Sequence, residues 1–238
     1  MSHSGAGYGW RMLIAGVLLL LVTSAAAGTR LAADNRAWET LAAACGVYRH
    51  RSVVLFGDSL MAQMSLARHF GLAPYRNRSV SGRLAVDALP DLVKAAAEAT
   101  DIVILLGTND LGTGVSPEET VAAVERLGLA ARHAGCRVVV CSVLPVSGEH
   151  LATRSPQVLE QVNRELAAMC GRNGLLFAEI APCFADGQGR LRKEFSSDGL
   201  HLSPPGQALL AVMVRRAVGM EYADGALPET LCGRSNDK

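Results

Sequence analysis

The feature of this sequence that most restricts its fold is a set of short apolar runs that do not alternate with polar residues. The clearest runs are residues 52–56, 102–106, 138–144 and 175–180, and each ends close to a Gly or Pro. Such runs are typical of parallel strands that are buried on both faces of a sheet. A weaker run at 78–80 predicts a further short strand.

Helical segments fill the gaps between these runs. The segment Ser116-Pro117-Glu118-Glu119 predicts a helix start, because Ser can cap the helix, Pro suits its first position and Glu completes a capping box. Residues 156–170 and the segment after Ser203-Pro204 carry apolar side chains at helical spacing, and residues 87–98 are a further candidate. This alternation predicts an α/β fold with a parallel sheet covered on both faces. Ligands on such sheets bind beyond the carboxyl ends of the strands.

The first 27 residues have the pattern of a secretory signal peptide. Arg11 precedes the apolar run from Met12 to Val22, and Ala25-Ala26-Ala27 supplies small residues for cleavage. An uncleaved membrane anchor is the alternative, because the apolar stretch reaches about 17 residues, the lower limit for spanning a bilayer. We favour cleavage, and therefore expect a secreted or periplasmic protein. An uncleaved leader would instead associate the chain with a membrane.

The rest of the chain is expected to form one folded domain. Its length of 238 residues allows a single α/β domain with a large core and is short for two. We assign residues 1–27 to the signal peptide or anchor, 28–50 to a lead-in, 51–219 to the domain and 220–238 to a tail.

The charge of the mature chain gives no reason to expect a nucleic-acid partner. The chain has 23 basic and 22 acidic residues, and removal of the leader takes away one arginine. Nucleic-acid binding domains carry a clear basic excess, which this domain lacks. Two small basic groups are interpreted as solvated loop charges: Arg76, Arg78 and Arg83, and Arg190, Arg192 and Lys193.

Six cysteines follow the proposed cleavage site, which permits disulfides in an exported chain. None has C-x-x-C spacing, so neither a zinc site nor a thioredoxin-like motif is indicated. We predict two bridges: Cys45–Cys232, which flanks the domain, and Cys136–Cys170, which would lie at the amino edge of two strands. For the four central cysteines, buried free thiols are the alternative.

Four polar segments lie at or beyond the ends of the predicted strands. They are Gly57-Asp58-Ser59-Leu60, Ser81-Gly82, Gly107-Thr108-Asn109-Asp110 and Asp198-Gly199-Leu200-His201. Together they offer a Ser, a Gly, an Asn, a His and an Asp to one edge of the sheet. Ester hydrolysis uses this set, because a serine nucleophile needs a base, the base needs an orienting carboxylate, and the oxyanion needs donors.

This arrangement resembles the SGNH hydrolase superfamily, the GDSL-type esterases and lipases, over most of residues 52–218. The resemblance rests on the four segments above, which occur in the family's order and on the expected elements. It implies a three-layer α/β/α sandwich of flavodoxin-like type, the SGNH hydrolase fold. It implies neither a metal ion nor an organic cofactor.

The resemblance also assigns roles to individual residues. Ser59 matches the nucleophile, His201 the base and Asp198 the carboxylate that orients the base. The oxyanion hole matches the backbone N–H groups of Ser59 and Gly82 together with the side-chain amide of Asn109.

Some residues in these segments depart from the family pattern or have other interpretations. Many relatives have Asn-x-Gly ahead of the second segment's glycine, whereas this chain has Asn77-Arg78-Ser79, so a different turn before Gly82 is expected. Asp58 is interpreted as structural and Asp110 as a residue that pins a loop.

The sequence therefore predicts a carboxylic ester hydrolase that forms an acyl-enzyme on small-molecule or polymer-borne acyl esters. Lipid-like esters are favoured because Trp and Tyr are scarce and because Leu60, Met61 and Met64 would suit an acyl chain, although core packing explains these residues equally well. A carbohydrate O-acetylesterase or an O-acyltransferase of the same fold is the alternative. A binding module without catalysis is disfavoured, because it would have no need of a base paired with a nucleophile.

Overall fold

The computed structural model describes residues 51–71 and 74–219. The predicted signal peptide, lead-in, tail and Cys45–Cys232 bridge lie outside the described residues.

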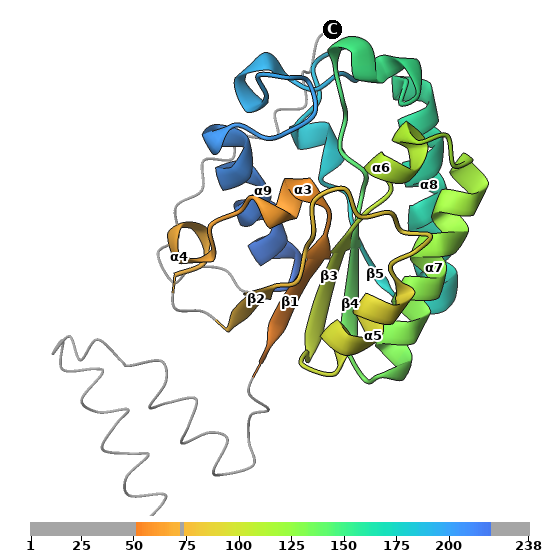
Figure 1. The fold of residues 1–238 in the computed structure, drawn as a ribbon, viewed down its shortest axis with the longest axis vertical. Coiled ribbons are helices and arrows are strands. Elements are labelled where there is room, and N and C mark those ends of the chain that lie inside the picture. The colour runs from red at the N-terminus through yellow and green to blue at the C-terminus, as the bar shows by residue number, and fades with distance from the viewer. Residues whose placement is uncertain (1–50, 72–73, 220–238) are drawn as a thin grey trace, which may run out of the picture. The chain divides into compact units, whose positions relative to one another are not determined.

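The centre of the domain is a five-stranded parallel sheet with the strand order β2-β1-β3-β4-β5 (Figure 1). This order is that of flavodoxin-like folds, and it confirms the predicted parallel α/β architecture. The strands are β1 (Val53–Gly57), β2 (Tyr75–Asn77), β3 (Asp101–Leu105), β4 (Arg137–Cys141) and β5 (Leu176–Ala178).

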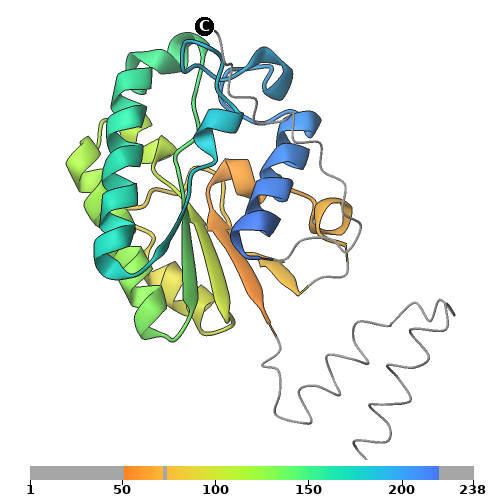
Figure 2. The same cartoon turned by 180° about the vertical axis from the view of Figure 1, so that it is seen from behind.

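Helices cover both faces of the sheet, which explains why its strands are apolar without alternation. Helices α5 (Leu89–Ala96), α7 (Pro117–His133) and α8 (Pro156–Asn173) pack on one face. Helices α3 (Ser59–Ala62), α4 (Leu66–His69) and α9 (Pro204–Ala217) lie on the other (Figures 1 and 2). Short helix α6 (Thr108–Gly112) follows β3, and the 3₁₀ turns η1 (Gly148–Ala152), η2 (Ala181–Cys183) and η3 (Lys193–Phe195) lie in loops.

The two faces of β1 show how this burial works residue by residue. Val54 and Phe56 belong to the core under α5, α7 and α8, whereas Val53 and Leu55 belong to the core under α9. All four side chains are fully buried. A strand with apolar partners on both sides has no solvent-facing positions for polar residues.

The second strand lies three residues before its predicted position. Residues 78–80 are not a strand, and Tyr75–Asn77 pair with Val53–Leu55 instead. The Asn77 side chain accepts the backbone N–H of Ser79 at 3.0 Å, which turns the chain at the point where the predicted strand would begin.

The predicted strand at 138–144 is also shorter than expected. Strand β4 ends at Cys141, and the next hydroxyl, Ser142 Oγ, accepts the backbone N–H groups of Ile180 (2.9 Å) and Ala181 (2.8 Å). After β5, the Ser142 side chain binds the backbone N–H groups that a neighbouring strand would otherwise bind. The regular pairing of β4 with β5 therefore ends at this point.

The predicted helix starts are confirmed. Ser116 Oγ accepts the N–H of Glu119 at 3.1 Å, and Ser155 Oγ accepts the N–H of Val158 at 3.3 Å. Ser203 precedes α9 but its hydroxyl donates to the carbonyl of Glu194 at 2.8 Å. That contact ties the start of α9 to the loop that precedes it.

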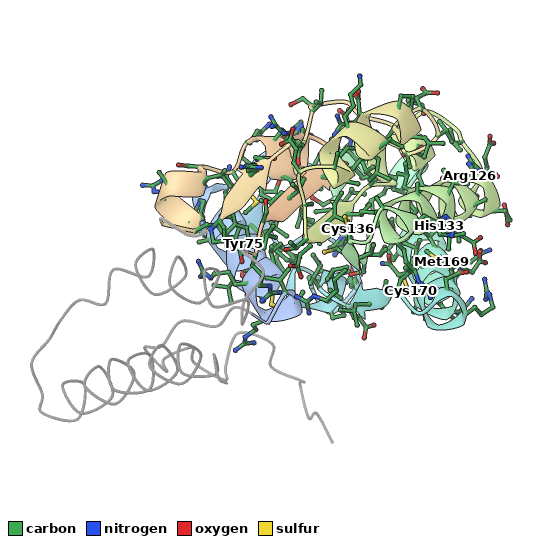
Figure 3. All side chains as sticks on the ribbon, turned by 90° about the horizontal axis from the view of Figure 1, so that it is seen from below. Tyr75, Arg126, His133, Cys136, Met169 and Cys170 are labelled. Carbon is green, nitrogen blue, oxygen red and sulfur yellow. The ribbon has the colours of Figure 1, made fainter. Side chains whose placement is uncertain are left out.

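The predicted Cys136–Cys170 bridge is wrong, because both residues are buried free thiols, as is Cys141. The Cys136 thiol points toward the end of α5, where it donates to the carbonyls of Ala96 and Ala99 at 3.4 Å each, while Cys170 lies in α8 (Figure 3). Burial raises the pKa of Cys170 to about 11. Cys183 is disulfide-bonded.

A buried carboxylate holds the amino edge of the sheet together. Asp101 accepts hydrogen bonds from Arg51 (2.9 and 3.1 Å) and from Arg137 (2.5 Å). Both arginines also donate to the carbonyl of Val218, at the end of α9. Burial opposes ionisation of Asp101, but the two arginines and Thr100 outweigh it and lower the pKa of this carboxyl.

Asp101→Asn should therefore lower the free energy of unfolding by about 2 kcal/mol at pH 7, less than for a fully buried pair because the arginines reach solvent. A lowered native pKa gives stability that is present above the unfolded pKa and is lost as the pH falls. Urea denaturation should accordingly show the gap between wild type and variant shrinking toward pH 3. Glu98→Gln, which breaks an exposed pair with Arg78, is the control and should change little. Equal urea midpoints for wild type and Asp101→Asn would contradict this account.

Candidate active site

The first and third predicted polar segments meet at the switch point of the sheet. Strand β1 has β2 on one side and β3 on the other, and chain order reverses between β1 and β3. Crevices at such a point are the usual ligand sites of open α/β sheets. Ser59 follows β1 and Asn109 follows β3, so both lie beyond the carboxyl ends of these strands, where Figure 1 shows helices α3 and α6 at the top of the sheet.

Ser59 is the first residue of α3 and is held by the turn before it. Asp58 caps this helix by accepting the N–H of Leu60 at 2.9 Å. Gly57 lets β1 end close to β3, since a Cβ there would come within 2.9 Å of the Leu105 carbonyl. The Ser59 side chain makes no hydrogen bond to any of the described residues, so its hydroxyl proton is available to a base.

Asp58 has the structural role predicted for it, and its environment is unusual. The residue is fully buried, and its Oδ2 has no partner among residues 51–71 and 74–219. Burial raises the pKa of Asp58 to about 6. Hydrogen bonding from Leu60 and the charge of His201 oppose this rise.

Asp198 and His201 form a hydrogen-bonded pair. Asp198 Oδ2 lies 2.8 Å from His201 Nδ1, and Oδ1 accepts the N–H groups of Leu200 (2.9 Å) and His201 (2.8 Å) and the hydroxyl of Ser196 (3.1 Å). Desolvation opposes ionisation, but the hydrogen bonds, that from His201 foremost, hold the pKa of Asp198 well below its usual range. An ionised carboxylate only accepts, so Nδ1 carries the proton and Nε2 keeps the lone pair of a base.

The turn between these two residues requires a glycine. Gly199 has a φ of +83°, and a Cβ there would lie 2.6 Å from the carbonyl of Ser147. The Gly199 carbonyl accepts the N–H of Ser147 at 2.8 Å. This contact fastens the Asp198–His201 turn to the chain that continues from β4.

Asn109 and Gly82 are joined through Arg83. The Asn109 side-chain amide donates one N–H to the Arg83 carbonyl at 3.2 Å, which orients it and leaves its second N–H for another acceptor. Gly82, with a φ of +77°, uses its N–H in no hydrogen bond among the described residues. These donors can serve an oxyanion.

The turn before Gly82 departs from the family's Asn-x-Gly pattern without losing its asparagine contacts. Asn77 Nδ2 donates to the carbonyl of Met61 at 2.7 Å, and Asn77 Oδ1 accepts from Ser79. Ser79 adds a hydroxyl hydrogen bond to the carbonyl of Leu55 at 3.3 Å. The serine therefore fits where relatives have glycine, and it ties the loop to β1.

Two neighbouring charged residues stabilise these loops. Asp110 is fully buried and accepts the N–H groups of Ala85 (2.9 Å) and Val86 (3.1 Å), as expected of a loop-pinning residue. The interpretation of Arg83 as a solvated charge is wrong. Its side chain is 8% exposed, lies 4.2 Å from the ring centre of Phe56 and pairs with Asp91 at 3.3 Å.

The structure thus brings Ser59, Gly82, Asn109 and the Asp198–His201 pair to one edge of the sheet. Ser59 and His201 are not hydrogen-bonded to each other. Catalytic hydrogen bonds are often open in unliganded sites and close around substrate.

The apolar residues after Ser59 do not form an acyl-chain surface. Leu60, Met61 and Met64 are at most 4% exposed and belong to the core between α9 and the sheet. Core packing, the alternative interpretation, is the correct one for these side chains.

The sequence interpretation missed one residue at this edge, Arg154. It lies between η1 and α8, is 8% exposed, and donates from Nε to the Thr108 carbonyl at 2.6 Å. Nothing near it in the sequence forms a motif, so its burial could come only from the structure.

Within the described part of the chain, no helix has the length and hydropathy needed to cross a bilayer. The same residues contain no group of three or more His, Cys, Asp or Glu side chains that could hold a metal ion.

Comparisons with known proteins bear on the family and the fold. The GDSL-like Lipase/Acylhydrolase family matches residues 55–209. Among solved structures, a GDSL-like lipase from Bacteroides thetaiotaomicron superposes with a TM-score of 0.64 and 18% identity, covering 76% of this chain and 97% of the other. A lipase/acylhydrolase from Enterococcus faecalis gives 0.60, with 19% identity and coverage of 71% and 95%. An acetylxylan esterase from Geobacillus stearothermophilus gives 0.59, with 16% identity and coverage of 72% and 95%.

Among curated proteins, an N-acylneuraminate cytidylyltransferase from Streptococcus agalactiae is 24% identical over 162 residues, which are 68% of this chain. The match spans only 37% of the length of that relative.

Proposed function

This chain belongs to the GDSL-like lipase/acylhydrolase family, and on that premise we propose that it is a serine carboxylic ester hydrolase with Ser59 as its nucleophile. The observation that carries the proposal is the Asp198–His201 pair, whose geometry leaves a basic nitrogen free at the edge where Ser59 lies. A hydroxyl becomes a nucleophile only when such a base takes its proton.

In the proposed mechanism, the Ser59 oxygen attacks the carbonyl carbon of the ester while His201 Nε2 takes the hydroxyl proton. The N–H groups of Ser59 and Gly82 and the Asn109 amide donate to the oxyanion. When the tetrahedral intermediate collapses, the ester C–O bond breaks and the protonated His201 gives its proton to the departing alcohol. Water then attacks the acyl-enzyme with His201 again as base, which releases the acid and restores Ser59.

For the substrate, the proposal is a carboxylic acyl ester, with lipid-like esters and carbohydrate O-acetyl esters as the two classes to compare. The burial of Leu60, Met61 and Met64 removes one argument for the lipid-like class and so favours testing carbohydrate esters equally. If a sugar hydroxyl replaced water in the second step, the same residues would catalyse acyl transfer.

The experiment is a screen of the purified protein against p-nitrophenyl esters of increasing chain length, a lysophospholipid and acetylated xylan. A parallel assay with a glycan acceptor would separate transfer from hydrolysis. Hydrolysis of at least one ester is expected. No turnover of any of them by folded protein would refute the proposal.

Asn109→Ala should lower kcat about 100- to 1,000-fold with little change in KM, the usual cost of losing one oxyanion donor. Asn109→Asp, which keeps the shape but not the donor, should be equally damaging. Steady-state kinetics on the best ester in the screen measures both. A change mainly in KM would make Asn109 a substrate-binding residue instead.

We also propose that the protein is exported and that its leader is removed near Gly28. The support is the charged start, apolar run and small residues of the first 27 positions. N-terminal sequencing of the extracytoplasmic fraction should find a chain that begins near Gly28. Intact Met1 in the membrane fraction would instead favour an uncleaved anchor.

A further inference from the structure

Buried charges among the described residues differ in how they are neutralised. Five charged groups are buried there: the residues Asp58, Asp101, Asp110 and Arg154, and the side chain of Arg83. Asp101 has two arginine partners and Asp110 accepts two backbone N–H groups. Of the two buried cations, Arg83 pairs with Asp91, whereas Arg154 makes no ion pair with any described carboxylate. A buried charge without a counter-charge is costly.

The contacts of Arg154 leave part of its guanidinium unused. Nε donates to the Thr108 carbonyl at 2.6 Å, and Nη1 lies 3.4 Å from Nδ1 of His150. Nη2 has no hydrogen-bond partner in the described part of the chain, yet it is not among the fully enclosed polar atoms. It lies over Gly112, where a Cβ would come within 1.7 Å of it. The lack of a side chain at Gly112 therefore leaves room for the Arg154 guanidinium. The N–H donors of its Nη2 have no partner among the described residues.

The position of Arg154 links it to the candidate active site on two sides. Thr108, whose carbonyl it binds, directly precedes Asn109. Its charge also interacts with that of Asp58, which directly precedes Ser59. Burial lowers the pKa of Arg154 and Asp58 opposes this, so the carboxylate offsets the cost of burying the cation only in part.

We propose that Arg154, with His150 beside it, recognises a carboxylate or phosphate group carried by the ester substrate. The proposal rests on the esterase function proposed above and names its substrate class as anionic esters. A guanidinium presents parallel N–H donors that match the oxygens of such groups. A bound anion would supply the negative charge that Arg154 lacks, because no described carboxylate forms an ion pair with it.

The test uses two pairs of esters that differ in one anionic group. A mono-acetylated methyl glucuronoside is compared with the matching methyl glucoside, and a lysophosphatidic acid with the monoacylglycerol of the same acyl chain. For each pair the readout is the ratio of kcat/KM for the charged ester to that for the neutral ester. This ratio cancels any loss common to both, such as that from disturbing the Thr108 contact.

In at least one pair, the wild-type ratio should exceed one, and Arg154→Gln should lower it about 10- to 100-fold, the usual weight of a hydrogen bond to a charged group. The affected pair identifies the anion as carboxylate or phosphate. Arg154→Lys should recover only part of the ratio, because lysine lacks the paired donors. Arg192→Gln removes an exposed arginine that pairs with Glu194 and should leave the ratio unchanged.

Gly112→Ala provides a second way to move the guanidinium while Arg154 stays in the chain. It should lower the same ratio, and it decides the question if Arg154→Gln does not fold. An unchanged ratio in both pairs, with neutral and p-nitrophenyl esters still hydrolysed, would overturn the anion site and leave the esterase intact. A wild-type protein that hydrolyses no ester at all would refute both.

Discussion

Ser59→Ala should lower kcat for ester hydrolysis about 10⁴- to 10⁶-fold, since serine-hydrolase sites lose activity on this scale with their nucleophile. The protein should remain folded, because the Ser59 hydroxyl makes no hydrogen bond within the described residues. Burst kinetics with a p-nitrophenyl ester should also show no acyl-enzyme in the variant.

Ser197→Ala is the matched control for this experiment. Ser197 is an exposed serine at the same edge, directly before Asp198, and its removal should change neither kcat nor thermal stability. A Ser59→Ala protein that kept more than a few per cent of wild-type activity would end the assignment of Ser59 as nucleophile.

His201→Ala should be about as damaging as Ser59→Ala, because without the base the serine keeps its proton. The double variant should be no worse than either single variant, since the members of a triad act as a unit. Asp198→Asn should cost less: it replaces an acceptor-only carboxylate with an amide, which disturbs the histidine's tautomer but leaves the base in place.

Thermal melts accompany these assays, with His133→Ala, an exposed histidine at the end of α7, as the control. The arrangement would be wrong if Asp198→Asn were harmless and a different acidic residue proved essential. In that case the 2.8 Å contact between Asp198 and His201 would be only structural.

The sequence predicts the central strands well because both of their faces are buried. Every position of β1 and β3 is buried, and apart from Asp101 at the start of β3 and Gly57 at the end of β1 the residues have large apolar side chains, so the apolar run and the strand nearly coincide. Edge strand β2 pairs only with β1, over three residues. One of these residues is exposed and one is half-buried, so their sequence cannot be told apart from that of a loop. The apolar pattern fails there because burial is incomplete.

That the polar segments around Ser59 and Asn109 lie at one edge of the sheet was also predictable, because each follows a parallel strand directly in the chain. The burial of Arg83 and Arg154 was not predictable in this way. Each is covered by residues that are distant in sequence, such as Phe56 for Arg83 and Gly112 for Arg154. Cys136 shows the same limit: its place before β4 was clear, but the carbonyls of α5 decide where its thiol points.

The amino-edge cluster around Asp101 has a consequence for engineering. Arg51 and Val218 lie at the two ends of the domain, yet both are held at this one carboxylate, Val218 through the arginines. Domains whose ends lie close together tolerate circular permutation. A short linker from residue 219 to residue 51 should therefore close the domain into a ring that can be reopened at a surface loop. Tethering the protein to a bead through either end of the domain would likewise leave the edge that carries Ser59, at the opposite end of the strands, open to solution.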